Sequence, residues 1–188
     1  MQAGKMWGGL RVHGSYLTTN LSNRLFKAVE NYGNTLQDPN AHLIVSSTYE
    51  GAIGLTAWTV SPFYTQPVKD PPVFKEFLDI RSAISTTRID TVTNFAKELF
   101  VGTPSGKRYL FATATFKNNA SSFAELLDIH YTGLNSVKGS RGFMSSFVLQ
   151  PISPMLTSKS AANGGNPLGV NPESGPLVCE YPCFVESK

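Results

Sequence analysis

The residues best suited to bind a small molecule alternate along three segments that have the composition of β-strands. Successive side chains of a strand point to opposite faces, so every second residue belongs to one face of a sheet. The candidate substrate-binding residues on one such face are Arg11, His13, Thr113, Thr115, Ser146, Val148 and Gln150. Small hydroxyl groups give orienting hydrogen bonds without bulk, which a binding pocket requires. The same pattern also fits a solvated face, which antiparallel sheets tolerate.

Groups that commonly catalyse reactions do not converge in the sequence. His130 falls on the apolar stripe of a predicted helix, which is typical of a core histidine, whereas His13 beside Arg11 is the better functional candidate. No carboxylate pairs with a second acid in the way that general acid–base catalysis uses. Segment 102–107 imitates a phosphate loop, but only three residues separate its glycines and Arg108 follows its lysine. No catalytic residue is therefore predicted.

The two cysteines, Cys179 and Cys183, lie near the C-terminus with three residues between them. A zinc site needs two further ligands nearby, and all three histidines are far away in the sequence. The spacing therefore predicts no metal site. It leaves open whether the thiols are unpaired or form one short local bridge.

Composition narrows the class of protein. Of 188 residues, 41% are hydrophobic, which is typical of a folded domain. Only 15% are charged, against about 25% in an average soluble domain, and the net charge is +3. So slight a charge excludes a nucleic-acid-binding footprint, and without a long apolar run we expect no membrane segment. A weakly charged surface is typical of one that a cofactor, another domain or a partner covers.

Hydrophobic periodicity predicts the elements that must position these residues. Strand patterns occupy 6–16, 42–49, 52–60, 108–116 and 143–150. Helical spacings occur at 20–33, 72–78, 91–101 and 122–138, and Ser122 with Glu125 forms a capping box at the last of these. Segment 151–176 has the composition of a loop. The order of elements predicts an α+β fold, with a mostly antiparallel sheet of about five strands and helices packed on one face.

Three stretches, taken in order, resemble the fungal FAD-linked oxidases of the berberine bridge enzyme-like group. They are Met6-Trp7-Gly8-Gly9, Phe147 to Ile152, and Gly164 to Gly169. The proline-punctuated segment from Tyr64 to Phe77 fits the same region of the family. The likeness covers most of residues 5–172. It implies a substrate-binding domain whose sheet covers the isoalloxazine ring of FAD.

The resemblance also implies roles for two residues. Gln150 matches a polar residue that precedes a proline in the family, where some members carry a glutamate that acts as a base. Because an amide does not accept a proton at neutral pH, we expect Gln150 only to orient the substrate. Asn166 is expected near the edge of the flavin as a cofactor-binding residue.

Departures from the family define the expected organisation. Family members begin with an FAD-binding domain, and nothing like it precedes Met1; Leu177 to Lys188 does not resemble their C-terminal segment. We therefore expect residues 1–172 to be a substrate-binding domain truncated at both ends, and residues 173–188 to be a divergent C-terminal tail. The main FAD site is expected to lie outside this chain.

Three functions remain open from the sequence. The first is the substrate-domain portion of a flavin-dependent oxidoreductase that oxidises a small alcohol or secondary metabolite, inactive alone and paired with a separate FAD-binding domain or chain. The second is a stand-alone protein that binds a small molecule or a partner with the same face. The third is a non-redox enzyme acting on a hydrophobic metabolite. The sequence specifies neither the compartment nor the oligomeric state.

Overall fold

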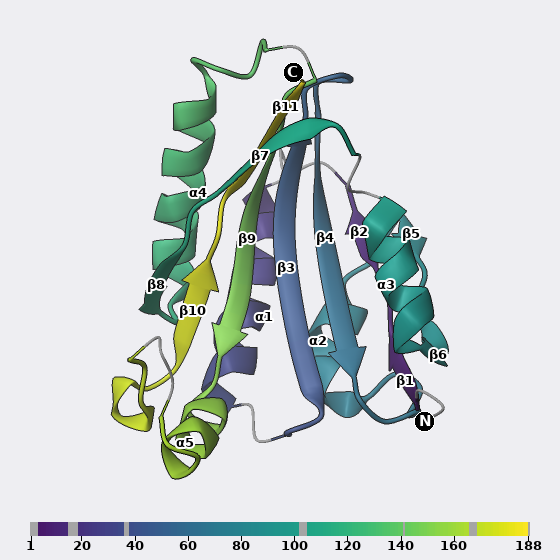
Figure 1. Ribbon diagram of the computed structural model, residues 1–188, viewed down its shortest axis with the longest axis vertical. Helices are drawn as coiled ribbons and strands as arrows, with labels where there is room; N and C mark the ends of the chain where they lie inside the picture. The colour runs from purple at the N-terminus through teal and green to yellow at the C-terminus, as the bar shows by residue number, and fades with distance from the viewer. Residues whose placement is uncertain are drawn as a thin grey trace.

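The computed structural model describes residues 4–14, 19–35, 38–101, 105–140, 142–165 and 169–187. Its strands form one sheet in which every pairing is antiparallel (Figure 1). The strands are β1 (Lys5–Gly8), β2 (Arg11–His13), β3 (Ala41–Glu50), β4 (Leu55–Tyr64), β5 (Ile84–Ser85), β6 (Arg88–Thr91), β7 (Lys107–Phe111), β8 (Ala114–Lys117), β9 (Met144–Ile152), β10 (Leu177–Glu180) and β11 (Cys183–Ser187).

Several of these short strands are two halves of one longer strand. β1 and β2 pair with β4 in a single register, because Gly8 lies opposite Phe63 and Arg11 lies opposite Val60. The same continuity joins β5 to β6, β7 to β8, and β10 to β11. Four joined pairs and three long strands place the eleven strands of the described residues at seven positions. Across the sheet the order is β5/β6, β1/β2, β4, β3, β9, β10/β11 and β7/β8.

The predicted α+β class and the antiparallel sheet are confirmed, but the predicted number of about five strands is wrong. Segments 84–91 and 177–187 supply the two positions that the periodicity missed. The first is polar and is interrupted at Thr86, whose hydroxyl accepts a hydrogen bond from the backbone N–H of Leu10 at 2.9 Å. The second contains Pro182, which has no N–H for the ladder. Both interruptions conceal the alternation that marks a strand.

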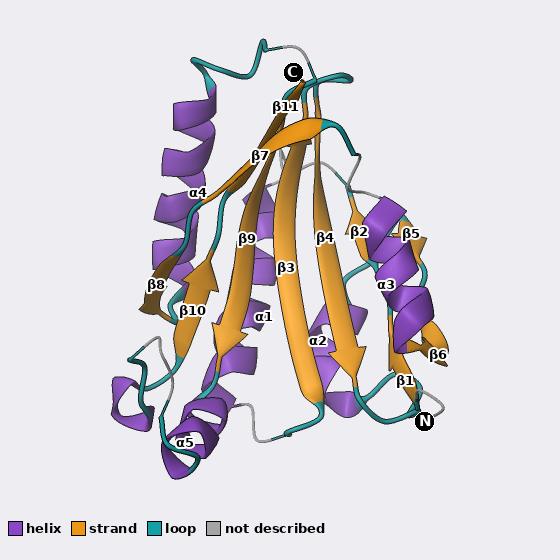
Figure 2. Cartoon of the chain, viewed as in Figure 1, coloured by secondary structure: helices purple, strands orange, loops and turns teal. Residues whose placement is uncertain are grey.

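Helices cover mainly one face of this sheet. α1 (Thr19–Thr35), α2 (Lys75–Leu78) and α4 (Ala120–Leu134) lie behind it in Figures 1 and 2, and we call this side the helix face. α3 (Val92–Val101) lies on the opposite side at one edge, where Phe95 contacts Phe63 edge to face at 5.6 Å. We call that opposite side the open face. The prediction that helices pack on one face therefore fails for α3 alone among these four.

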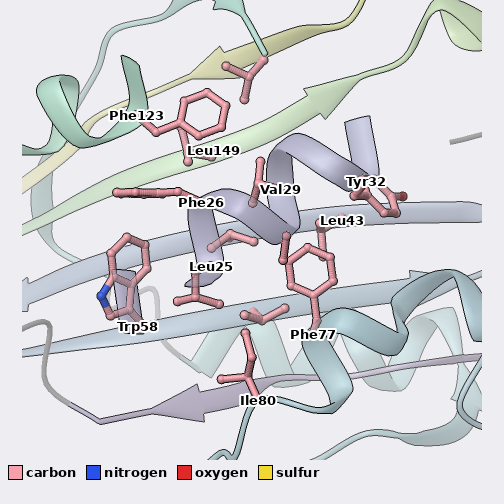
Figure 3. Packing of buried hydrophobic residues seen from close by; sticks show 14 of the residues in the cluster. Leu25, Phe26, Val29, Tyr32, Leu43, Trp58, Phe77, Ile80, Phe123 and Leu149 are labelled. Carbon is pink, nitrogen blue, oxygen red and sulfur yellow. The ribbon is translucent and has the colours of Figure 1, made fainter. Parts of the chain in front are cut away.

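The core lies between the helix face and its helices (Figure 3). Phe26 of α1 contacts Trp58 of β4 edge to face at 5.5 Å and Phe123 of α4 at 5.9 Å. These rings join two helices to the centre of the sheet, and all three side chains are almost fully buried. Burial of a large apolar side chain contributes about 2 kcal/mol, so this layer fixes which face of the sheet remains uncovered.

The segment predicted as a loop, 151–176, contains a helix and a helical turn. α5 (Pro154–Ala162) follows β9 directly, and a 3-10 turn (Pro172–Ser174) precedes β10. The segment beyond it, expected to be a divergent tail, continues into the sheet as β10 and β11. Among the helices of the described residues, none has both the length and the apolar character needed to span a membrane.

Candidate functional site: the open face of the sheet

The register of the ladder shows which candidate residues share the open face. Val45 and Leu149 are opposite each other and belong to the core, so their neighbours along β3 and β9 point away from the helices. Ser146, Val148 and Gln150 of β9 are therefore together on the open face. Cys179 lies opposite Gln150 on one side and opposite Thr115 on the other, which adds Thr115 to the same face.

Hydroxyl groups dominate the centre of this face. The register adds side chains from β3 and β4 that sequence reasoning missed: Ser46, Thr48, Thr59 and Ser61. Thr48 Oγ1 and Ser146 Oγ lie 2.9 Å apart and are hydrogen-bonded across the β3–β9 pair. The alternation along 42–49 and 52–60 carried this signal, but it could be assigned to a face only after the pairing was known.

Gln150 is held by a second residue that sequence reasoning did not assign to the site. Its Nε2 lies 3.0 Å from Nε2 of His42 on β3, so the amide N–H donates a hydrogen bond to this ring nitrogen, which carries no proton. Partial desolvation lowers the pKa of His42, which favours the neutral imidazole. A neutral imidazole can accept a proton at neutral pH, whereas the amide of Gln150 can only donate and accept hydrogen bonds.

Arg11 and His13 belong to the helix face, and the expectation that they share the open face is wrong. They lie opposite Val60 and Trp58, which are core residues. Arg11 Nη2 donates to the carbonyl oxygens of Leu78 at 3.1 Å and of Ile80 at 2.9 Å.

The reason for this placement is the end of α2. The last carbonyl groups of a helix lack partners within the helix, and Arg11 supplies donors to two carbonyls at this end. His13 is 1% exposed, and its Nδ1 lies 3.0 Å from the carbonyl oxygen of Arg81. Burial lowers the pKa of both side chains. Polarity alone predicts an open face for both side chains, but in the fold they hydrogen-bond to backbone carbonyl groups.

Two other candidates are not brought into the cluster. Thr113 is exposed and lies between β7 and β8, where no ladder pair fixes its direction. Asn166 lies outside the described residues. The predicted site is thus reduced to Thr115, Ser146 and Gln150, while Val148 shares their face but is buried. To these the structure adds His42 and the hydroxyl groups of β3 and β4.

Both cysteines are free and lie on the open face. Cys179 lies opposite Gln150 and Cys183 lies opposite Ser146, so the two cysteines are four positions apart along the sheet. At about 3.3 Å per residue, the distance is about 13 Å, beyond the roughly 7 Å that a disulfide spans. A short local bridge is therefore excluded, and burial raises the pKa of both thiols. No group of three or more metal-ligating side chains occurs within the part of the chain that the structure covers.

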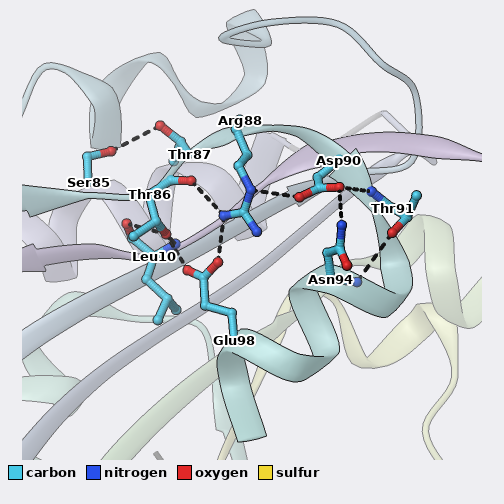
Figure 4. Close-up of polar contacts among 9 residues, drawn as sticks. All are labelled: Leu10, Ser85, Thr86, Thr87, Arg88, Asp90, Thr91, Asn94 and Glu98. Atoms are coloured by element: carbon cyan, nitrogen blue, oxygen red, sulfur yellow. Dashed lines mark hydrogen bonds and ion pairs between the residues drawn. The ribbon is translucent and has the colours of Figure 1, made fainter. Parts of the chain in front are cut away.

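α3 limits the open face at the β1 edge (Figure 4). Arg88 Nη1 donates to Glu98 Oε2 at 2.5 Å and Arg88 Nε donates to Asp90 Oδ2 at 2.8 Å, while the guanidinium group lies 4.7 Å from the centre of the Phe95 ring. These contacts join β6 to α3. Gly8 makes room beneath them, because a Cβ atom there would clash with the ring of Phe63. The hydroxyl-rich part of the face lies beyond Phe63, over β3, β4 and β9.

Sequence comparisons give relatives of one kind. The chain is 27% identical over 192 residues to an FAD-dependent monooxygenase of Fusarium proliferatum, covering 95% of this chain and 36% of that protein. It is 26% identical over 188 residues to an FAD-dependent monooxygenase of Aspergillus calidoustus (97% of this chain, 35% of that protein). A third, of Cochliobolus heterostrophus, is 29% identical over 193 residues (96% and 36%). No protein-family model matches the chain.

A solved structure shares the fold. A single-residue variant of berberine bridge enzyme matches with a TM-score of 0.58 and 10% identity over 96% of this chain and 36% of that one. This chain therefore spans about one third of the length of the proteins that it matches. The resemblance predicted from the sequence motifs is confirmed: the chain is similar in sequence to one segment of FAD-dependent monooxygenases of fungi and shares its fold with one segment of berberine bridge enzyme.

Proposed function

We propose that this chain acts as the substrate-binding part of a flavin-dependent oxidoreductase, with its open face covering the isoalloxazine ring of FAD. The observation that carries the proposal is a sheet with a core on one side and hydrogen-bonding side chains on the other, in a fold shared with a flavoenzyme. When FAD is bound, the isoalloxazine ring would supply the hydride-accepting chemistry of the oxidation. The protein binds and orients the substrate against it.

The residues present fit the ring of FAD and not its pyrophosphate. The hydroxyl groups of Ser46, Thr48 and Ser146 and the amide of Gln150 can hydrogen-bond to a planar polar ring or to a substrate above it. A pyrophosphate is usually held by a glycine-rich turn that leads into a helix, and the sequence contains no such fingerprint. We therefore assign the main cofactor site to a separate domain or chain. A contact between Asn166 and the flavin remains a prediction.

Gln150 and His42 have different roles toward the substrate in this proposal. Gln150 orients a substrate hydroxyl group through its amide, and the hydrogen bond with His42 fixes the direction of that amide. Oxidation of an alcohol also requires that its hydroxyl proton be removed. His42 is a neutral imidazole on the open face, and its Nε2 can accept this proton when the hydrogen bond from the Gln150 amide is broken.

The first test asks where the cofactor binds. The purified chain is incubated with FAD and desalted, then mixed with the FAD-loaded remainder of one of the curated relatives. We expect a colourless chain after desalting and a stable complex with the flavin-loaded partner. Yellow colour retained by the chain alone would contradict the assignment of the main cofactor site elsewhere.

The second test concerns the substrate. In the reconstituted complex, Gln150→Leu should slow the reduction of the flavin by an alcohol substrate at least about tenfold, because the substrate loses its orienting hydrogen bond. Thr56→Val, a change on the helix face of β4, serves as the matched control and should leave this rate unchanged. Equal rates in the two variants would argue against a substrate role for the open face.

The stand-alone binding protein remains the second candidate. It is supported by the open face itself, whose hydroxyl groups are arranged by contacts within this chain alone, such as that between Thr48 and Ser146. A screen of small aromatic alcohols by thermal shift on the isolated chain tests it. A rise in Tm of several degrees without flavin would favour this candidate over the first.

A further inference from the structure

A separate hollow lies on the helix face, between α4 and the strands β10 and β11. Its volume is about 310 Å³, and its walls are mostly apolar, with Leu126, Ile129 and Leu134 from α4 and Phe184 from β11. It is on the side of the sheet away from the open face, since Glu180 in its lining lies opposite the core residue Leu149. The proposed flavin function makes no use of it.

One of two ionisable side chains in this hollow is already satisfied. Nε2 of His130 lies 3.1 Å from Oγ of Ser145, and its ring stacks on Phe184 with 5.8 Å between centroids and 23° between planes. Desolvation lowers the pKa of His130 to about 4, so the imidazole is neutral near pH 7. It therefore supplies no positive charge to the hollow.

The other, Glu180, has no partner in the described part of the chain. Its side chain is buried, with the residue 8% exposed, and its carboxyl group makes no hydrogen bond or ion pair there. The residues opposite it on the neighbouring strands are Leu149 and Ala114, and none of the described residues that line the hollow is a lysine or an arginine. Burial raises the pKa of Glu180 to about 7, which is the effect of removing a carboxylate from water without a counter-charge.

An unpaired carboxyl group in an apolar hollow selects a particular ligand chemistry. A cation that donates hydrogen bonds supplies both the missing charge and the missing donors, and charge-assisted hydrogen bonds are the strongest of their kind. The apolar walls require that this cation carry an apolar body. A neutral molecule of the same shape would fill the walls but leave the carboxylate without a counter-charge, and an anion would be repelled.

We propose that the hollow between α4 and β10–β11 binds a small amphiphilic amine, whose ammonium group pairs with Glu180 and whose apolar body packs against Leu126, Ile129 and Phe184. A ring with a short alkylammonium chain is of a size that suits a hollow of about 310 Å³. The site is independent of the open face, so it is expected in the isolated chain without flavin.

Three probes of one shape test the chemistry: 2-phenylethylamine, 2-phenylethanol and phenylacetate, each titrated into the chain by calorimetry at pH 8. We expect the amine to bind at least tenfold more tightly than the alcohol and phenylacetate not to bind. Equal affinity for amine and alcohol would overturn the ammonium–Glu180 pair. Absence of amine binding would overturn the site.

Two variants locate the effect. Glu180→Gln keeps the shape of the side chain and removes its charge, so it should lower the amine affinity at least tenfold and leave the alcohol unchanged. Glu125→Gln makes the same chemical change at an exposed position of α4 and should alter neither. An unchanged amine affinity in Glu180→Gln would contradict the proposal.

A measurement on the unsubstituted chain keeps the test valid if Glu180→Gln does not fold. Amide chemical shifts are followed by NMR while 2-phenylethylamine is added. The expected changes lie within 126–137 and 180–184, the two ranges that contain the residues lining the hollow. Changes confined to the open-face strands β3 and β4 would instead overturn the assignment.

Discussion

At the scale of single residues, polar side chains in this chain serve two different purposes. Gln150 and His42 pair on the open face, where a ligand can reach them, whereas Arg11 satisfies carbonyl groups at the end of α2. The sequence offers no direct means of telling these apart, because both kinds alternate correctly along a strand. The distinction depends on which face the helices cover, and that is a property of the assembled fold.

A substitution at Gln150 tests whether its side chain contributes to the stability of the fold. Gln150→Leu should change the free energy of unfolding by no more than about 1 kcal/mol, because His42 is exposed and water can replace the lost amide. Leu149→Ala, one residue earlier and in the core, should cost about 2–5 kcal/mol. Urea unfolding of both variants measures this. Comparable losses would show that Gln150 is structural.

The raised pKa of Glu180 leads us to expect that the free energy of unfolding depends on pH. Its pKa is raised from an ordinary 4.5 to about 7, so between these values the folded chain retains a proton that the unfolded chain has released. The free energy of unfolding should therefore fall as pH rises from 4.5 to 7, by up to about 3 kcal/mol at about 1.4 kcal/mol per pKa unit.

The difference between the unsubstituted chain and Glu180→Gln isolates this contribution. His130 acts with the opposite sign, because its lowered pKa makes the folded chain less stable as pH falls from 6.5 towards 4, and it acts equally in both proteins. Urea unfolding at pH 5 and pH 8 should show a stability difference that changes with pH. A constant difference would mean that Glu180 ionises normally in the folded chain.

At the scale of elements, the sequence predicted well where the pattern was local and continuous. The apolar stripe of α1 and the long strands β3, β4 and β9 have unbroken periodicity, and all four are present. It failed for β5/β6 and β10/β11, whose alternation is interrupted, and for α3, whose side of the sheet depends on the contact between Phe95 and Phe63. For the candidate site, alternation along β9 was enough to predict its residues. The hydroxyl groups of β3 and β4 could be assigned to the same face only from the strand pairing.

The start of α4 gives a prediction at this scale. The sequence predicted a capping box at Ser122 and Glu125, but the structure begins the helix two residues earlier, and Oδ1 of Asn119 accepts hydrogen bonds from the N–H groups of Ser121 and Ser122. Asn119→Ala should therefore cost about 1 kcal/mol of stability, and Ser122→Ala less than about 0.5 kcal/mol. Thermal unfolding of both decides between the two caps. A larger loss of stability for Ser122→Ala than for Asn119→Ala would show instead that Ser122 caps the helix.

At the scale of the whole molecule, the two faces of the sheet differ in what covers them. One face is closed by α1, α2 and α4 over a core of aromatic rings, and the other carries hydroxyl groups, an amide and two free thiols. About two thirds of the length of its matched relatives lies outside the region that corresponds to this chain. The low charge predicted a covered surface, and our account assigns that cover to a flavin-bearing partner on the open face.

The two thiols of the open face provide the most direct test of this assignment. The rate of alkylation of Cys179 and Cys183 by N-ethylmaleimide is measured for the chain alone and in complex with the FAD-loaded remainder of a relative. Lys27→Cys places a control thiol on the exposed side of α1. Our account predicts that the complex slows alkylation of both native thiols at least tenfold and leaves the thiol introduced at position 27 unaffected. Native thiols that stay reactive in a complex that protects position 27 would contradict it.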